Sequence, residues 1–163
     1  MKLFRSDLEQ LISNQLFEIS TDNLDLGELQ VAGNIIMCTI SVETAANGYR
    51  IYGKLNARLK ESCDRCLANF IEDHELNINV ILTNDDTLLN EKNIDIIRFA
   101  GSEEFVDLTP VFHDLVLLAE PFKKLCDNDC KGLCSNCGKN LNLTTCACHL
   151  SKEDTRWDLL KNI

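Results

Sequence analysis

The fold is decided by residues 49–82, YRIYGKLNARLKESCDRCLANFIEDHELNINVIL. Apolar and polar residues alternate along this stretch on both sides of the Cys63–Cys66 turn, a period that is typical of strands with one face on a core. The residues expected on the core side of the first strand are Tyr49, Ile51, Gly53, Leu55, Ala57 and Leu59. The pattern therefore predicts two long antiparallel strands joined by the cysteine-containing turn.

A third strand is expected just before this pair. Ile36, Cys38, Ile40 and Val42 alternate with more polar neighbours. The dipeptide Asn47-Gly48 then predicts a tight hairpin turn in which both central residues have positive φ. Three consecutive segments of this kind predict an antiparallel meander.

Shorter elements are expected around the meander. Residues 5–17 predict a short helix, or a helix followed by a strand, and residues 94–99 predict a strand after a polar loop at 83–92. Thr109-Pro110 is typical of an N-cap followed by proline at the first helical position. It predicts a short helix, buried on nearly all sides, that ends before Pro121, and a last helical turn is expected near residues 152–160.

The expected architecture is an α+β fold: an antiparallel β-meander-rich domain with short helices and a C-terminal cysteine-rich zinc module. The predicted domains are residues 1–120, which carry the first Cys-x₂-Cys turn, and residues 121–163, which form the zinc-binding module and tail. A chain of 163 residues can fold as one domain with such an appended module.

Composition limits the classes of function. The chain has no stretch of apolar residues long enough to cross a membrane, and its first residues lack the apolar segment of a signal peptide. We therefore expect a cytoplasmic protein, in which thiols are reduced and clustered cysteines are metal ligands or redox groups. The net charge of −10 argues against non-specific nucleic-acid binding through whole-protein charge.

Eight of the nine cysteines form four close pairs, which predict metal binding. The pairs are Cys63 with Cys66, Cys126 with Cys130, Cys134 with Cys137, and Cys146 with Cys148. Zn²⁺ prefers four ligands in a tetrahedron, commonly two from each of two short turns. The last two pairs, with glycine after Cys137, predict one Cys₄ site, and the first two pairs a second. A single Zn²⁺ that draws on a mixture of the pairs is the alternative, so one or two ions are expected.

The remaining candidate residues point away from catalysis. Cys38 alternates with core residues and is expected to be a buried structural thiol. His149 follows Cys148 and could replace a cysteine ligand, while His74 and His113 are expected to be structural. The chain has no glycine-rich phosphate loop and no supported Ser/His/Asp arrangement. We therefore expect a protein that is not an enzyme and has no small-molecule substrate.

Two other cysteine chemistries fit less well. The spacing Cys130-x₃-Cys134-x₂-Cys137 is that of the radical-SAM iron–sulfur motif, but the chain is too short for the barrel that surrounds such a cluster. Thioredoxin-like chemistry at Cys63 and Cys66 requires a helix after the motif, and here a strand is predicted.

One strand face is rich in cations. The candidate RNA-binding residues are Arg50, Tyr52, Lys54, Arg58, Lys60 and Arg65. On RNA the cations would contact phosphates and Tyr52 would stack on a base. The other interpretation, which the chain alone favours, is cross-strand pairing of the cations with Asp73 and Glu75 on a solvated face.

The combined motif resembles a known family. Cys63-Asp-Arg-Cys66-Leu67 follows a meander, and residues 126–148 contain CDNDCKGLCSNCGKNLN followed by CAC. This combination is similar to the bacterial large ribosomal RNA subunit accumulation proteins, the YceD family, which has plastid relatives; Ser135 stands where proline is frequent.

The resemblance implies a role in large-subunit (23S) ribosomal RNA accumulation or processing, hence in ribosome biogenesis, without a known catalytic activity. The expected partner is that RNA or a pre-ribosomal particle. The alternative is a zinc-stabilised interaction module that docks on a ribosomal protein or an RNA-processing enzyme.

Overall fold

The computed structural model describes residues 1–45, 47–85 and 95–148, and the chain forms two compact units. Unit 1 comprises Met1–Glu61 and Phe70–Phe122, and unit 2 comprises Ser62–Asn69 together with the chain from Lys123 onward. The sequence-based division assigned the first cysteine turn to residues 1–120. In the structure this turn, Ser62–Asn69, groups with the C-terminal segment, because its two cysteines meet Cys126 and Cys130.

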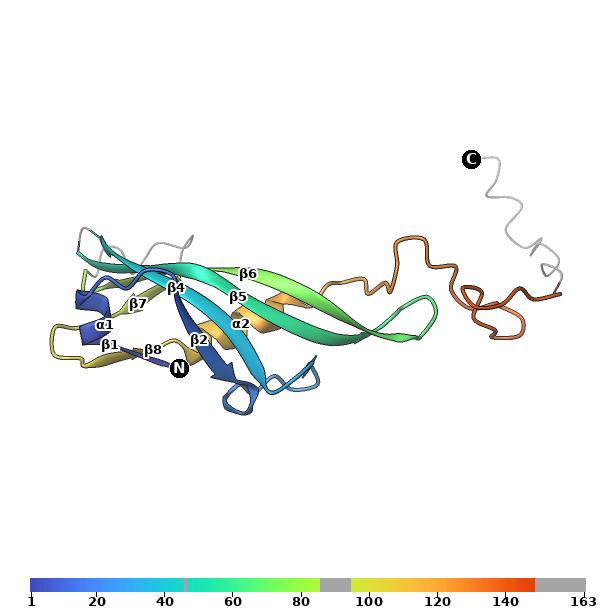
Figure 1. The fold of residues 1–163 in the computed structure, drawn as a ribbon, viewed down its shortest axis with the longest axis horizontal. Coiled ribbons are helices and arrows are strands. Elements are labelled where there is room, and N and C mark those ends of the chain that lie inside the picture. The colour runs from blue at the N-terminus through green and yellow to red at the C-terminus, as the bar shows by residue number, and fades with distance from the viewer. Residues whose placement is uncertain (46, 86–94, 149–163) are drawn as a thin grey trace, which may run out of the picture. The chain divides into compact units, whose positions relative to one another are not determined.

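Unit 1 is built on a six-stranded sheet (Figure 1). Its strands are β2 (Gln15–Ser20), β3 (Gln30–Val31), β4 (Ile35–Ala45), β5 (Gly48–Ser62), β6 (Asn69–Thr83) and β7 (Asp95–Arg98). The order across the sheet is β2-β4-β5-β6-β7, with β3 paired to β5, and β7 runs parallel to β6. The predicted meander is therefore confirmed as β4, β5 and β6.

The burial of β5 follows the predicted alternation. Leu55, Ala57 and Leu59 are inaccessible to solvent, whereas Asn56 and Arg58 between them are exposed. Leu55 lies opposite Cys38 of β4 in the antiparallel register. Because successive side chains of a strand point to opposite faces, one face of the sheet carries the apolar core.

The position of Gly48 differs from the turn position that the sequence predicted. Ala45 pairs with Gly48, so Gly48 is the first residue of β5 rather than a central turn residue. A Cβ atom at Gly48 would lie 1.9 Å from the carbonyl oxygen of Leu82. Glycine is required here because the backbone of β6 passes so close, and φ is +156°.

Short elements complete unit 1. They are β1 (Lys2–Phe4), α1 (Arg5–Glu9), the 3₁₀ turn η1 (Thr21–Asn23), β8 (Phe105–Asp107) and α2 (Thr109–Ala119). β1 and β8 pair as a separate two-stranded antiparallel sheet. The helix-then-strand interpretation of residues 5–17 and the strand predicted at 94–99 are both confirmed.

The helix α2 begins and packs differently from the prediction. Leu108 occupies the N-cap position, and the Asp107 carboxylate accepts hydrogen bonds from the Thr109 amide (2.9 Å) and hydroxyl (2.6 Å). Phe112 and Val116 are buried, but Leu118 is 83% exposed. The expectation of burial on nearly all sides is wrong, because residues four apart form a single stripe that faces the core.

Two predicted elements lie partly or wholly outside the described residues. The polar loop at 83–92 is described only to residue 85, and the helical turn expected at 152–160 lies beyond residue 148. Within the described ranges, none of the helices has the length and apolar character needed to cross a membrane.

Candidate metal centres

Unit 2 brings eight thiols into two groups of four. The first cluster consists of Cys63, Cys66, Cys126 and Cys130, and the second cluster of Cys134, Cys137, Cys146 and Cys148. In each cluster the four Sγ atoms lie within 4.8 Å of one another. These are the groups that the spacing of the pairs predicted, rather than a mixture of the pairs around one ion.

The sulfur spacing in the first cluster suits a tetrahedral ion. Cys63 Sγ lies 3.8 Å from Cys130 Sγ, and Cys66 Sγ lies 3.5 Å from Cys126 Sγ. Four sulfurs at about 2.3 Å from a central Zn²⁺ are about 3.8 Å apart, whereas sulfurs in a disulfide are about 2.05 Å apart. All nine cysteines are free thiols. The described geometry is thus able to hold one metal ion per cluster.

Both Cys-x₂-Cys turns have the same local geometry. The amide of Leu67 donates to the Cys63 carbonyl, and the amide of Gly138 donates to the Cys134 carbonyl, each at 2.9 Å. The residue after the second cysteine has a left-handed conformation in both turns, with φ of +58° at Leu67 and +69° at Gly138. The chain reverses at this residue, so both sulfurs of a turn are aimed at one point.

The β5–β6 turn is fixed to the C-terminal segment by backbone groups. The Asp64 amide donates to the Lys124 carbonyl, and the Lys124 amide donates to the Asp64 carboxylate, both at 2.8 Å. These reciprocal bonds hold the segment that carries Cys126 beside the turn that carries Cys66.

Arg65 has a structural position in the same unit. Its guanidinium donates to the carbonyl of Cys130 at 2.9 Å, and its own carbonyl accepts from the Leu133 amide at 3.0 Å. Gly132 packs against it so closely that a Cβ atom there would lie 3.0 Å from the Arg65 carbonyl oxygen. Arg65 thus binds the chain that leads from the first cluster to the second.

Asn142 joins the two clusters and was missed in the sequence analysis. Its side-chain amide donates to Cys130 Sγ at 3.2 Å, and its side-chain oxygen accepts from the Lys131 amide at 2.7 Å. Asn142 belongs to the loop between the cysteine pairs of the second cluster, yet it contacts a sulfur of the first. The signal in the sequence was the repeated asparagine in Asn140-x-Asn142 after the Cys137 turn.

Hydrogen bonds lower the pKa of some thiols in each cluster and raise the pKa of others. Hydrogen bonds from backbone amides, chiefly that of Cys126, lower the pKa of Cys63 to about 6. At the second cluster, backbone amides, chiefly that of Cys137, lower the pKa of Cys134 to about 6. The Asn142 amide likewise lowers the pKa of Cys130. Thiols that ionise readily attract a divalent cation, which then displaces the remaining protons of the cluster.

Other thiols of the clusters have the opposite shift. Cys126 donates to Cys66, and Cys148 donates to Cys137, which raises the pKa of each donor thiol to about 12. Each cluster therefore shares its protons among neighbouring sulfurs, as expected where several thiols converge on one point.

The remaining cysteine is structural. Cys38 is fully buried in the sheet of unit 1, and burial raises its pKa to about 12. The expectation of a buried thiol is confirmed. His149, the alternative ligand, lies outside the described residues.

Three cations of β5 are paired with carboxylates. Arg50 lies 3.0 Å from Glu43, and two pairs match the cross-strand interpretation: Lys54 with Glu75 at 2.6 Å and Arg58 with Asp73 at 2.8 Å. The pairing that the sequence favoured is confirmed. These pairs are solvent-exposed and weak, so the cations can exchange partners, and RNA contact by this face stays a prediction.

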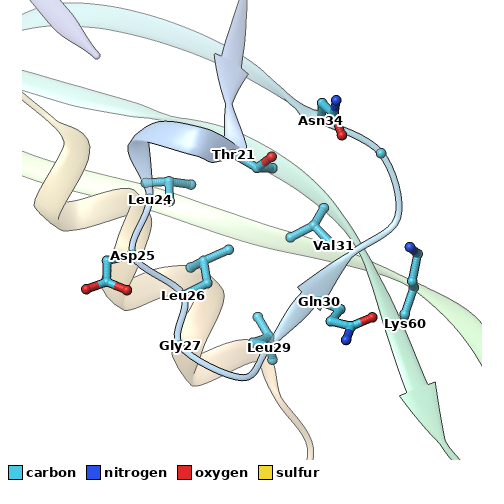
Figure 2. A pocket seen from close by; sticks show the side chains of 11 residues that line it. Thr21, Leu24, Asp25, Leu26, Gly27, Leu29, Gln30, Val31, Asn34 and Lys60 are labelled. Atoms are coloured by element: carbon cyan, nitrogen blue, oxygen red, sulfur yellow. The ribbon is translucent and has the colours of Figure 1, made fainter.

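The other candidate RNA-binding residues of unit 1 are Tyr52 and Lys60, and Tyr52 lies beside the first of these pairs. The Arg50 guanidinium lies 5.6 Å from the centre of the Tyr52 ring, which is partly exposed. Lys60 lies opposite Gln30 of β3 and lines a recess whose other polar side chains include Thr21 and Asn34 (Figure 2).

Comparison with known proteins identifies the relatives of this chain. The family model described as "Large ribosomal RNA subunit accumulation protein YceD" matches residues 51–163. A chloroplastic protein of Arabidopsis thaliana, named "Large ribosomal RNA subunit accumulation protein YCED homolog 1", is 33% identical over 42% of this chain and 22% of its own length. The Zea mays protein of the same name is 34% identical over 33% of this chain and 19% of its own.

A bacterial relative matches over a longer range. An uncharacterized protein of Mycobacterium tuberculosis is 26% identical over 65% of this chain and 51% of its own length. The chain thus spans about a fifth of the length of the plant relatives and about half that of the mycobacterial one. No solved structure matches.

Proposed function

The chain belongs to the family of large ribosomal RNA subunit accumulation proteins YceD, and from this premise we propose that it is a non-enzymatic ribosome biogenesis factor. It supports the accumulation or processing of large-subunit (23S) ribosomal RNA in the cytoplasm. The observation that carries the proposal is the pair of Cys₄ clusters, which lie within the part of the chain that the family model matches.

The clusters each hold one Zn²⁺ as a structural ion. Four cysteine sulfurs are the donor set that structural zinc sites use, and they leave no open coordination position for a substrate. The buried apolar side chains in the described part of unit 2 are Cys63, Cys66 and Cys130. Since no leucine or valine core is found in these residues, cross-linking by the metal supplies the stability that a core would give.

The cellular function is tested by removing the protein. Cells of its source that are depleted of the chain should contain less large-subunit than small-subunit ribosomal RNA, and the wild-type chain should restore the ratio. A Cys63→Ser, Cys66→Ser variant should not restore the ratio. Cys38→Ser and Cys126→Ala are unsuitable controls, because the first changes the buried core of unit 1 and the second changes a cysteine of the first cluster. The control is Glu104→Gln, a change at an exposed residue of unit 1, which should restore the ratio. An unchanged ratio in depleted cells would refute the proposal.

Substitution of the cations of β5 tests whether the chain binds RNA directly. The change of Arg50, Lys54 and Arg58 to Ala should weaken binding to large-subunit ribosomal RNA and reduce its dependence on salt concentration. The reverse change, Asp73→Asn with Glu75→Gln, should strengthen binding, because it releases two cations from their carboxylate partners. Electrophoretic mobility shifts at several salt concentrations measure both effects. Binding that is equal in all three proteins would exclude this face.

A second function, docking on a ribosomal protein or an RNA-processing enzyme, is favoured by a groove in unit 1. It lies between β7 and α2, and its apolar lining includes Ile96, Ile97, Val111, Leu115 and Leu118. If the purified chain binds no RNA but sediments with assembly intermediates, and Leu118→Asp abolishes that association, this function replaces direct RNA binding.

A further inference from the structure

Near the β5–β6 turn, the core-facing side of β5 and β6 carries ionisable side chains instead of apolar ones. On β5 the inward positions Ala57 and Leu59 are followed by Glu61, which is only 5% exposed. On β6 the inward positions Ile78 and Leu76 are preceded by His74 and Glu72. Because residues two apart share a face of a strand, Glu61, Glu72 and His74 occupy positions where the pattern calls for apolar side chains.

The three side chains converge. One ligand atom from each lies within 4.8 Å of the others, and His74 Nε2 is 3.6 Å from a Glu61 carboxylate oxygen. The Nε2 atom is buried and has no hydrogen-bond partner among the described residues. Glu72 is exposed, so the group is open to solvent on one side.

We propose that Glu61, Glu72 and His74 form a third metal site, which binds a divalent transition-metal ion such as Zn²⁺ through one nitrogen and two carboxylate oxygens. Imidazole and carboxylates are ordinary ligands of this class of ion. Two carboxylates neutralise its charge, and an ion at this point supplies the partner that the imidazole nitrogen lacks. Three protein ligands leave one position for water, and exposed Glu72 gives the ion a path of entry.

The competing explanation is an ion pair between Glu61 and a protonated His74 without metal. The two explanations differ in what they require of Glu72. An ion pair at 3.6 Å needs only Glu61 and His74. A metal site needs the third ligand, so neutralising Glu72 separates them.

The test counts metal ions on the intact chain. Native mass spectrometry of full-length protein equilibrated with a small excess of Zn²⁺ should show three ions on the wild type and two on Glu72→Gln and on His74→Gln. Matched controls are Asp73→Asn, whose side chain pairs with Arg58 on the opposite face, and His113→Gln on α2. Both controls should keep three ions. Circular dichroism establishes that each variant is folded.

A second measurement identifies the ligands. With the cysteine clusters filled by Zn²⁺, added Co²⁺ should give weak visible bands without sulfur-to-metal charge transfer, and Glu72→Gln should lower its affinity at least tenfold. The proposal is overturned if the wild type gains no ion beyond those of the cysteine clusters, or if both variants keep the extra ion. The difference of one ion between wild type and Glu72→Gln is expected even if a cysteine cluster is empty, so this result is independent of the proposed function.

Discussion

Single residues outside the ligand set shape the cysteine clusters. Asn142 donates to Cys130 Sγ while its side-chain oxygen holds the Lys131 amide, so one side chain orients both a sulfur and the backbone next to it. Hydrogen bonds to a metal ligand favour its ionised form and fix its direction. Asn142 is therefore a positioning residue of the first cluster.

The change Asn142→Ala is expected to weaken zinc binding at the first cluster by about 10- to 100-fold, the usual effect of losing such a partner. The rate of zinc transfer to a coloured chelator measures it, and one of the two ions bound by the cysteine clusters should leave faster than in the wild type. Asn128→Ala is the matched control, because the contact of Asn128 with Arg65 is made by its backbone carbonyl. Equal rates in the two variants would contradict the role of Asn142.

At the scale of elements, α2 is tied to the loop before β3 by one histidine. His113 lies between the Asp114 carboxylate, 2.8 Å from Nδ1, and the Asp25 carbonyl, 2.9 Å from Nε2. The hydrogen bond to the Asp114 carboxylate raises the pKa of His113, and the hydrogen bond to the Asp25 carbonyl raises it further. The protonated imidazole can donate from both nitrogens, so it suits both acceptors at once.

This contact makes the stability of unit 1 depend on pH. Because the pKa is raised in the folded state, the stabilisation is fully present below the unfolded value of about 6.5 and is lost as pH rises through the folded value. The difference in thermal midpoint between wild type and His113→Gln should therefore be larger at pH 5 than at pH 8. Thermal unfolding followed by circular dichroism measures it, and a pH-independent difference would show that the charge has no role.

At the scale of the whole molecule, the two units are stabilised by different means. Unit 1 buries a contiguous set of aliphatic and aromatic side chains that includes Leu3, Ile40, Leu55, Val80 and Phe112. The described part of unit 2 buries cysteines instead. Its order should therefore depend on metal, whereas that of unit 1 should not.

Removal of zinc by a chelator is expected to unfold unit 2 and leave unit 1 folded. Amide hydrogen exchange should show loss of protection in residues 62–69 and 123–148, while β4 and the central part of β5 stay protected. Re-addition of Zn²⁺ should restore the pattern. Simultaneous loss of protection in both units, or none in either, would contradict this division of stability.

Much of this organisation was predictable because it depends on local patterns. Alternating residues specify which face of β5 is buried, and close cysteine pairs specify turns whose sulfurs can share an ion. The strand β4, the helix-then-strand start and the pairing of Lys54 and Arg58 with Glu75 and Asp73 follow from the same short-range rules.

The errors arose where a distant segment decides the outcome. Gly48 was assigned to a turn, yet it is glycine because the β6 backbone at Leu82 approaches it. The helix α2 was expected to be buried all round, yet its exposed Leu118 depends on what packs against it. The periodicity of apolar residues along the chain does not reveal which distant segment packs against Gly48 or leaves Leu118 exposed.

The sequence by itself determined the strands of the meander, the turns that aim each pair of thiols, and the reversal at Gly138. Only the tertiary structure decided that the four pairs form two separate clusters rather than one mixed group, that Asn142 joins the clusters, and that Glu61 reaches His74. The physical reason is range: alternation and turn geometry act between near neighbours in the chain. Convergence of ligands is set by how strands and loops distant in sequence pack together.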